Sequence, residues 1–184
     1  PAEFAKPYVK AQLPVVTGQE LHEADNTALA EMIQTVAAVE SPVHADEVAK
    51  RLMDAYGVAR AGSRIAARLS VALQHAAAQR LIDVRGEFVH AIGGDPVEVR
   101  DRSSFSSTER KIELVAPEEL DAALVASVRL GFSLAPDDAV ASAINLLGFG
   151  RATQKIAVVV QERLVQLTGA GRLVSSNGVL TLPP

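Results

Sequence analysis

An internal repeat is the feature that most constrains what this chain of 184 residues can fold into. Residues 56–61 (YGVARA) match residues 147–152 (LGFGRA) at an offset of 91, and Asp46 meets another aspartate at the same offset. Single identities are weak evidence, but turns, helix starts and hairpins recur in one order along two whole segments. The repeat predicts two copies of one module, over residues 20–92 and 112–184.

The first copy has the pattern of three helices and a hairpin. Pro42 ends the first helix, because proline disfavours a helical residue before it. A second helix is predicted from Ala45 to Gly57 and a third over residues 61–78, and the run 81–90 indicates strand, turn and strand. Asp25 or Asn26 can cap the first helix, whose apolar stripe is Leu29, Met32, Ile33, Val36 and Val39.

The second copy repeats this plan with different start and stop signals. Pro117 and Pro136 suit the first turn of a helix, where the missing N–H costs nothing. A third helix is predicted over residues 151–168, and Asn177-Gly178 is a strong signal for a two-residue hairpin turn. The predicted fold class is mainly α with small β-hairpins, as a tandem repeat of two winged helix-turn-helix-like modules.

Two segments lie outside the repeated modules. Residues 93–111 are rich in glycine, proline and serine, which predicts an extended and mobile linker. Residues 1–19 are predicted to connect the first module to a preceding domain. Their apolar side chains need a surface to cover, and these are Phe4, Tyr8, Leu13, Val15 and Val16.

Composition excludes several functional classes. The absence of cysteine excludes a disulfide scaffold, a thiolate metal site and a cysteine nucleophile. No apolar run approaches the roughly 18 residues that cross a bilayer, and the first ten residues lack a signal-peptide core, so a cytoplasmic protein is expected. The four histidines show no metal-ligand spacing, and the serines of the linker have no nearby histidine base. We expect no catalytic residue, metal or cofactor in this chain.

The net charge of −4 conceals a partition along the chain. Residues 20–50 carry seven acids against one lysine, whereas residues 51–90 carry six arginines against three acids. Residues 148–184 carry four basic residues against one acid. The third helix and hairpin of each copy are therefore basic, and the opening helix of the first copy is acidic.

Basic residues at the third helix and wing suggest nucleic-acid binding, because these elements contact nucleic acid in winged-helix proteins and guanidinium groups suit phosphates. The spacing of four residues places three arginines in one stripe. The alternative is a solvated or protein-facing surface, which the overall acidity favours. The predicted nucleic-acid-binding residues are Arg60, Arg64, Arg68, Arg85, Arg151 and Lys155.

The second copy departs from the stripe at Val159, which stands where the first copy has Arg68. Three consecutive valines over 158–160 cannot all fit a single core stripe. We therefore predict that Val159 lies in a protein interface and that the second copy mainly packs against protein.

Three segments of the first copy resemble a specific family: residues 20–23 (ELHE), 39–52 (VESPVHADEVAKRL) and 60–65 (RAGSRI). They resemble the poorly characterised C-terminal domain of large bacterial superfamily I DNA helicase-related proteins, which follows a helicase motor and a restriction-endonuclease-like domain. Tyr8 and residues 110–114 (RKIEL) also resemble the family pattern. The resemblance implies a larger ATP-dependent protein whose motor and nuclease residues lie upstream, so no catalytic residue is carried over to this chain.

Two functions remain open at this point. The leading hypothesis is a non-catalytic accessory region that binds or positions nucleic acid, most simply DNA, for the upstream motor and nuclease domains. The alternative is a protein-interaction or scaffolding module that docks the motor or forms a homo-oligomer. Neither hypothesis involves a membrane.

Overall fold

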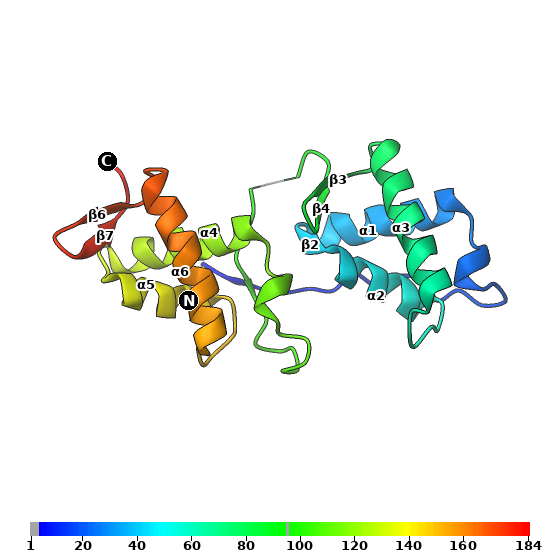
Figure 1. Cartoon of the computed structure of the whole chain (residues 1–184), viewed down its shortest axis with the longest axis horizontal. Helices are drawn as coiled ribbons and strands as arrows, with labels where there is room; N and C mark the ends of the chain where they lie inside the picture. Colours follow the sequence, from blue (N-terminus) through cyan, green and yellow to red (C-terminus); the bar gives the residue numbers. More distant parts are fainter. Residues whose placement is uncertain (1–3, 95) are drawn as a thin grey trace. The chain divides into compact units, whose positions relative to one another are not determined.

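The computed structural model describes residues 4–94 and 96–184, and the chain divides into two compact units. Val9–Pro96 form the first unit. The residues up to Tyr8 and the segment Val97–Pro184 form the second. Both units are mainly α-helical with small sheets (Figure 1), as the sequence predicts.

Among its described residues, the first unit contains three α-helices, one short 3-10 helix (η1) and a three-stranded antiparallel sheet in the order β2-β4-β3. Val43 of β2 pairs with Val89 of β4, so the short strand after the first helix joins the C-terminal hairpin. The elements are η1 (Leu21–Glu23), α1 (Asn26–Glu40), β2 (Val43–His44), α2 (Ala45–Ala55), α3 (Ser63–Ala78), β3 (Ile82–Arg85) and β4 (Phe88–Ala91).

Local signals set the helix boundaries of the first unit. The Asp25 carboxylate accepts a hydrogen bond from the Thr27 N–H at 2.8 Å, which caps α1. His44 caps α2 in the same way through Nδ1, which accepts from the Asp46 N–H at 3.1 Å. The helices bury one core, which includes Leu29, Ile33, Val36, Leu52, Leu69 and Ala72.

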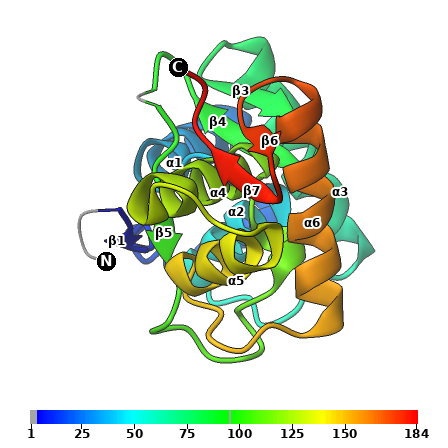
Figure 2. The ribbon, with the colours of Figure 1, turned by 90° about the vertical axis from the view of Figure 1, so that its left-hand side faces the viewer.

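The second unit also contains three helices followed by a hairpin. Leu134, between the first two helices, forms an antiparallel bridge with Leu180 of the hairpin. Figure 2 shows this hairpin, β6–β7, beside α4 and α5. The elements are β1 (Lys6–Pro7), β5 (Arg100–Asp101), η2 (Ile112–Leu114), α4 (Pro117–Gly131), α5 (Pro136–Leu146), α6 (Gln154–Gly169), β6 (Val174–Ser176) and β7 (Val179–Thr181).

The two units share their element order and one pairing detail. The Leu134–Leu180 bridge of the second unit lies 91 residues along the chain from the Val43–Val89 pair of the first. In each unit the segment between the first two helices therefore pairs with the last strand of the hairpin. Both hairpins lie where the sequence places them, including a turn at Asn177 and Gly178 with positive φ at both residues.

Residues 93–111 differ from the extended, mobile linker that the sequence predicts. From Val97 onward they belong to the second unit, where β5 pairs in parallel with β1. Val99 and Arg102 are buried. The reason is a long-range contact: the Arg102 guanidinium donates to the Glu119 carboxylate on α4 at 2.7 and 2.8 Å. The composition of the segment carries no sign of that partner.

The predicted connecting segment 1–19 is divided between the units, and its first three residues lie outside the described residues. Phe4 packs against the core of the second unit, whereas Ala11 and Leu13 pack against the core of the first. Val15 covers no surface, since 79% of it is exposed. The apolar residues of this segment therefore complete two different cores.

Candidate interaction surfaces

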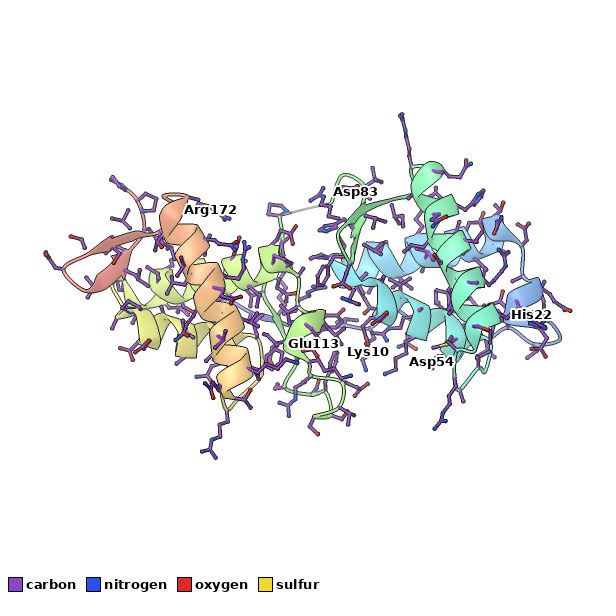
Figure 3. All side chains as sticks on the ribbon, in the orientation of Figure 1. Lys10, His22, Asp54, Asp83, Glu113 and Arg172 are labelled. Atoms are coloured by element: carbon purple, nitrogen blue, oxygen red, sulfur yellow. The ribbon has the colours of Figure 1, made fainter. Side chains whose placement is uncertain are left out.

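The predicted arginine stripe of α3 separates into exposed and engaged residues. Arg60 and Arg64 are exposed at the start of the helix, and Arg64 Nη1 donates to Nε2 of His22 at 3.3 Å. Figure 3 labels His22 on η1. Arg68 is half-buried, and its guanidinium donates to the Ala24 carbonyl and the Asn26 side chain. Arg68 thus ties α3 to the start of α1 and is part of the internal structure.

The hairpin turn of the first unit offers less positive charge than the sequence suggests. Arg85 donates to the Asp83 carboxylate at 2.8 Å, and both side chains are largely exposed. An exposed pair of this kind contributes little to stability and can exchange partners. Arg85 therefore lies on the surface, but a neighbouring carboxylate offsets its charge.

Most basic residues of the third helix and hairpin of the second unit have a carboxylate partner. Arg163 and Arg172 both contact the buried carboxylate of Asp121, at 2.6 and 3.3 Å. Lys155 pairs with Glu113 at 3.1 Å. The pKa of Glu113 is lowered by its own backbone N–H and by this lysine. Arg151 is exposed and has no ion pair among the described residues.

Two exposed cations recur at the start of the third helix in both units. Arg60 and Arg64 flank the first residue of α3, and Arg151 and Lys155 lie at the equivalent positions of α6. We call these four residues the basic helix starts. Each pair stands beside backbone N–H groups at the positive end of a helix, which favours anions.

Val159 is half-buried and packs against the core of its own unit. The valines that α6 presents to solvent are Val158 and Val165, and 69% of Val165 is exposed. They lie seven residues apart and hence on one face of the helix. The excess apolar surface that the sequence predicts on α6 is therefore present, but at Val158 and Val165 and not at Val159.

A hollow of about 450 Å³ lies between α2 and α3 of the first unit. Of the described residues that line it, Asp46 alone is charged, and the rest are mostly apolar. The lining includes Ile33, Ala45, Val48, Ala49, Met53, Ala66 and Leu73.

A buried ion pair fixes the C-terminal end of α1. Glu40 is fully buried, and its carboxylate accepts from Arg51 at 2.8 and 2.9 Å and from the Ala11 N–H at 2.8 Å. Glu47 also contacts Arg51, at 3.0 Å. These bonds compensate the desolvation of the charges, and they attach the N-terminal segment to the first unit.

A second buried carboxylate organises the N-terminal part of the second unit. Glu119 is fully buried and accepts hydrogen bonds from Arg100 and Arg102, which lie 4.6 and 4.8 Å from the centre of the Tyr8 ring. Phe105 packs edge-on against that ring. Burial alone would raise the pKa of Glu119, but the two guanidinium groups outweigh it and lower the pKa. The cluster is a structural clamp, because every charge in it has a partner.

Sequence reasoning missed both carboxylates, although one carried a visible signal. In α1 the core positions are Ile33, Val36, Ala37 and Glu40, so an acid occupies the end of the apolar stripe. Val39, assigned to that stripe from the sequence, is 49% exposed. An acid on a core stripe requires a buried cation, and Arg51 lies on the core face of α2. Glu119 gave no such signal, because acids are common in a helix first turn.

Among residues 4–94 and 96–184, no three histidine or acidic side chains come together in a way that could hold a metal ion. None of the helices described in the structure is long and apolar enough to cross a membrane.

Comparison with known families finds a match within the first unit. A family model described as a protein of unknown function (DUF3320) matches residues 19–67. This stretch spans η1, α1, β2, α2 and the first residues of α3, and it includes Arg60 and Arg64. Searches of curated proteins and of solved structures found no match.

Proposed function

We propose that the two units are a tandem pair of winged-helix modules. The support is the order helix, strand, helix, helix and hairpin in the first unit, with the short strand added to the edge of the hairpin. In the second unit the bridge at Leu134 stands in the place of that strand. In this fold the third helix and the hairpin wing are the elements that contact nucleic acid.

We further propose that the chain is a non-catalytic accessory region that binds nucleic acid, most simply DNA, through the basic helix starts. The observation that carries this proposal is the recurrence in both units of two exposed cations, one just before the third helix and one in its first turn. Guanidinium and ammonium groups beside the N-terminal N–H groups of a helix form a favourable site for phosphate. Arg68 contributes only indirectly, by holding α3 in place.

The expected affinity is modest and depends strongly on salt. If all four cations of the basic helix starts contact phosphates, the logarithm of the duplex binding constant falls with the logarithm of salt concentration with a slope of about −3.6. Binding then weakens roughly 100-fold between about 50 and 200 mM salt. The overall negative charge of the chain lowers the affinity further.

Fluorescence anisotropy with labelled single- and double-stranded oligonucleotides tests the proposal. The double variant Arg60→Glu/Arg64→Glu should lose binding at about 50 mM salt while its thermal stability stays close to wild type, because both side chains are exposed. The control Lys6→Glu/Arg80→Glu changes the net charge equally, at exposed positions away from the start of α3. If both double variants lose oligonucleotide binding equally, the loss reflects net charge and not these two positions. Wild type that fails to bind would overturn the proposal.

The larger context is also a proposal. Residues 39–65 carry the densest resemblance to the C-terminal domain of helicase-related proteins, and the matched family model covers the same stretch without assigning a function. On this basis the partners are nucleic acid and upstream motor and nuclease domains of the same polypeptide, in the cytoplasm. No cofactor is expected to bind the chain itself.

The hollow between α2 and α3 supports a second candidate function, protein docking. Its apolar lining suits an apolar segment of a partner, and Asp46 at its edge suits a partner cation. The variant Ala66→Arg separates the two functions, because it fills the hollow and adds a positive charge. Docking predicts that this variant loses association with the upstream domains supplied in trans. Nucleic-acid binding through the basic helix starts predicts unchanged or tighter binding of this variant to oligonucleotides.

A further inference from the structure

Phe132 is the most exposed large apolar side chain among the described residues. It lies in the short connection between α4 and α5, and 88% of it is exposed. Burying a phenylalanine ring removes a large apolar area from water, whereas an exposed ring contributes nothing to the stability of the fold. The packing of the second unit therefore does not explain this residue.

The backbone at Phe132 is strained. Its φ of 59° and ψ of −43° fall near the rare γ-turn that side-chain-bearing residues seldom adopt. The Ser133 N–H donates to the Gly131 carbonyl at 2.6 Å, which closes that three-residue turn. Strain of this kind persists where surrounding structure enforces it and is concentrated at functional sites.

Neighbouring residues hold the turn in place from both sides. Any side chain at Gly131 would meet Leu134, since a Cβ there would lie 2.6 Å from the leucine side chain. Leu134 is in turn bridged to Leu180 of β7, with hydrogen bonds of 2.7 and 3.2 Å in the two directions. The exposed ring is thus presented by a turn whose ends are fixed in the fold.

A hollow of about 510 Å³ lies on the same two helices that Phe132 connects. Leu130, two residues before Phe132, lines it from α4 and is itself exposed. The remaining lining comes from α5 and consists of Asp138, Ala141, Ser142, Asn145 and Leu146. A projecting apolar ring and a recess with mixed apolar and polar lining therefore lie on the same pair of helices.

This surface carries one cation and one anion, Arg129 and Asp138, that can pair between two copies of the chain. Arg129 lies in the last turn of α4, three residues before Phe132 in the chain, and Asp138 lines the recess. Both are exposed, and neither has an ion pair among the described residues. Asp138 in the recess, with the exposed Asp137 next to it in the chain, repels phosphate, so this surface does not suit nucleic acid.

We propose that two copies of this chain associate through this surface about a two-fold axis. Phe132 of each copy enters the recess of the other, and Arg129 of each copy faces Asp138 of the partner subunit. A surface that holds both a projection and a recess, with a cation at one and an anion at the other, is self-complementary in the way a two-fold pair requires. The proposal is independent of nucleic-acid binding, because it uses none of the basic helix starts.

The patch is small, so the dimer is weak. Interfaces below about 1,000 Å² in total are typical of transient complexes, and we expect a dissociation constant on the order of 100 μM. Sedimentation velocity of the full chain from about 10 μM to about 1 mM should show a reversible shift from monomer to dimer. A wild-type chain that stays monomeric over this range overturns the proposal.

Phe132→Gly tests the role of the ring by two measurements, the stability of the monomer and the affinity of the dimer, which should not fall together. Glycine accepts a positive φ, so the thermal stability of the monomer should be unchanged or raised. The dissociation constant should rise about 30-fold or more, because a central aromatic group is lost from the interface. Val165→Ser is the matched control, since Val165 is 69% exposed on α6 of the same unit. Equal association in Phe132→Gly and wild type contradicts the proposal, and so does an equal loss in the control.

A charge exchange between copies tests the two-fold geometry. Arg129→Asp gives two acids at each facing position, and Asp138→Arg gives two cations, so each variant alone should stay monomeric. An equimolar mixture of the two variants should associate at least as well as wild type, because each facing position then holds opposite charges. A mixture that stays monomeric while wild type dimerises excludes this arrangement.

Discussion

Replacing Gly148 by alanine should destabilise the second unit far more than replacing Gly57 by alanine destabilises the first. The two glycines are equivalent in the repeat, follow the second helix of their units, and have φ values of 81° and 68°. At Gly57 no described atom lies within 4 Å of an added Cβ. This substitution therefore costs only the left-handed backbone conformation, about 1–2 kcal/mol.

At Gly148 the same Cβ would lie 2.2 Å from Oδ1 of Asp101, 2.4 Å from the Ser103 nitrogen and 2.5 Å from the Arg102 nitrogen. Backbone cannot move aside like a flexible side chain, so the segment 101–103 must be displaced. Displacement breaks the hydrogen bond from the Arg102 N–H to the Leu147 carbonyl and disturbs the Arg102–Glu119 pair. We expect a total cost of about 4 kcal/mol or more, by analogy with overpacking and with breaking a buried ion pair.

Scanning calorimetry measures both variants, because each substitution should shift the transition of its own unit. A loss of about 4 kcal/mol corresponds to a fall in Tm of roughly 15 °C or more for a unit of this size, against roughly 5–10 °C for Gly57→Ala. If the two falls agree within about 2 °C, residues 101–103 do not pack against Gly148 and the reasoning fails.

Three further predictions concern side chains that the fold uses internally. Arg68→Ala should lower the free energy of unfolding of the first unit by about 1–3 kcal/mol, measured by urea unfolding, because Arg68 is hydrogen-bonded to Ala24 and Asn26. Arg60→Ala is the control and should change it by less than about 0.5 kcal/mol. Glu119→Gln should cost about 3–5 kcal/mol, since it leaves Arg102 buried without its counter-charge, and Glu113→Gln is the exposed control. The pKa of Glu119 is lower in the folded than in the unfolded chain. Its contribution to stability is therefore complete above the unfolded pKa of about 4.5 and is lost as pH falls through the folded pKa. Acid titration followed by circular dichroism should show that Glu119→Gln is less sensitive to acid than wild type.

Local features of the sequence were sufficient to predict most elements of the fold. Asp25 caps α1, and prolines begin α4 and α5 at Pro117 and Pro136. The turn at Asn177 and Gly178 closes β6–β7. Each of these signals acts over a few residues, which is why it can be recognised without knowledge of the tertiary structure.

The side-chain partners of the candidate surface could not be predicted in the same way. Arg68 has the same helical spacing as Arg64, yet its partners lie 42 and 44 residues earlier in the chain. Arg100 and Arg102 stand in a segment with the composition of a linker, and Glu119 on α4 makes them part of a core. Such pairings depend on which helices meet, and spacing within one helix contains no information about that.

The salt dependence of nucleic-acid binding tests the proposed function most directly. We expect a slope of about −3.6 for wild type and of about −1.8 for Arg60→Ala/Arg64→Ala, because that variant loses two of four phosphate contacts. Arg151→Ala/Lys155→Ala should give the same reduction. An unchanged slope in both variants, or no binding of wild type at about 50 mM salt, would contradict binding through the basic helix starts.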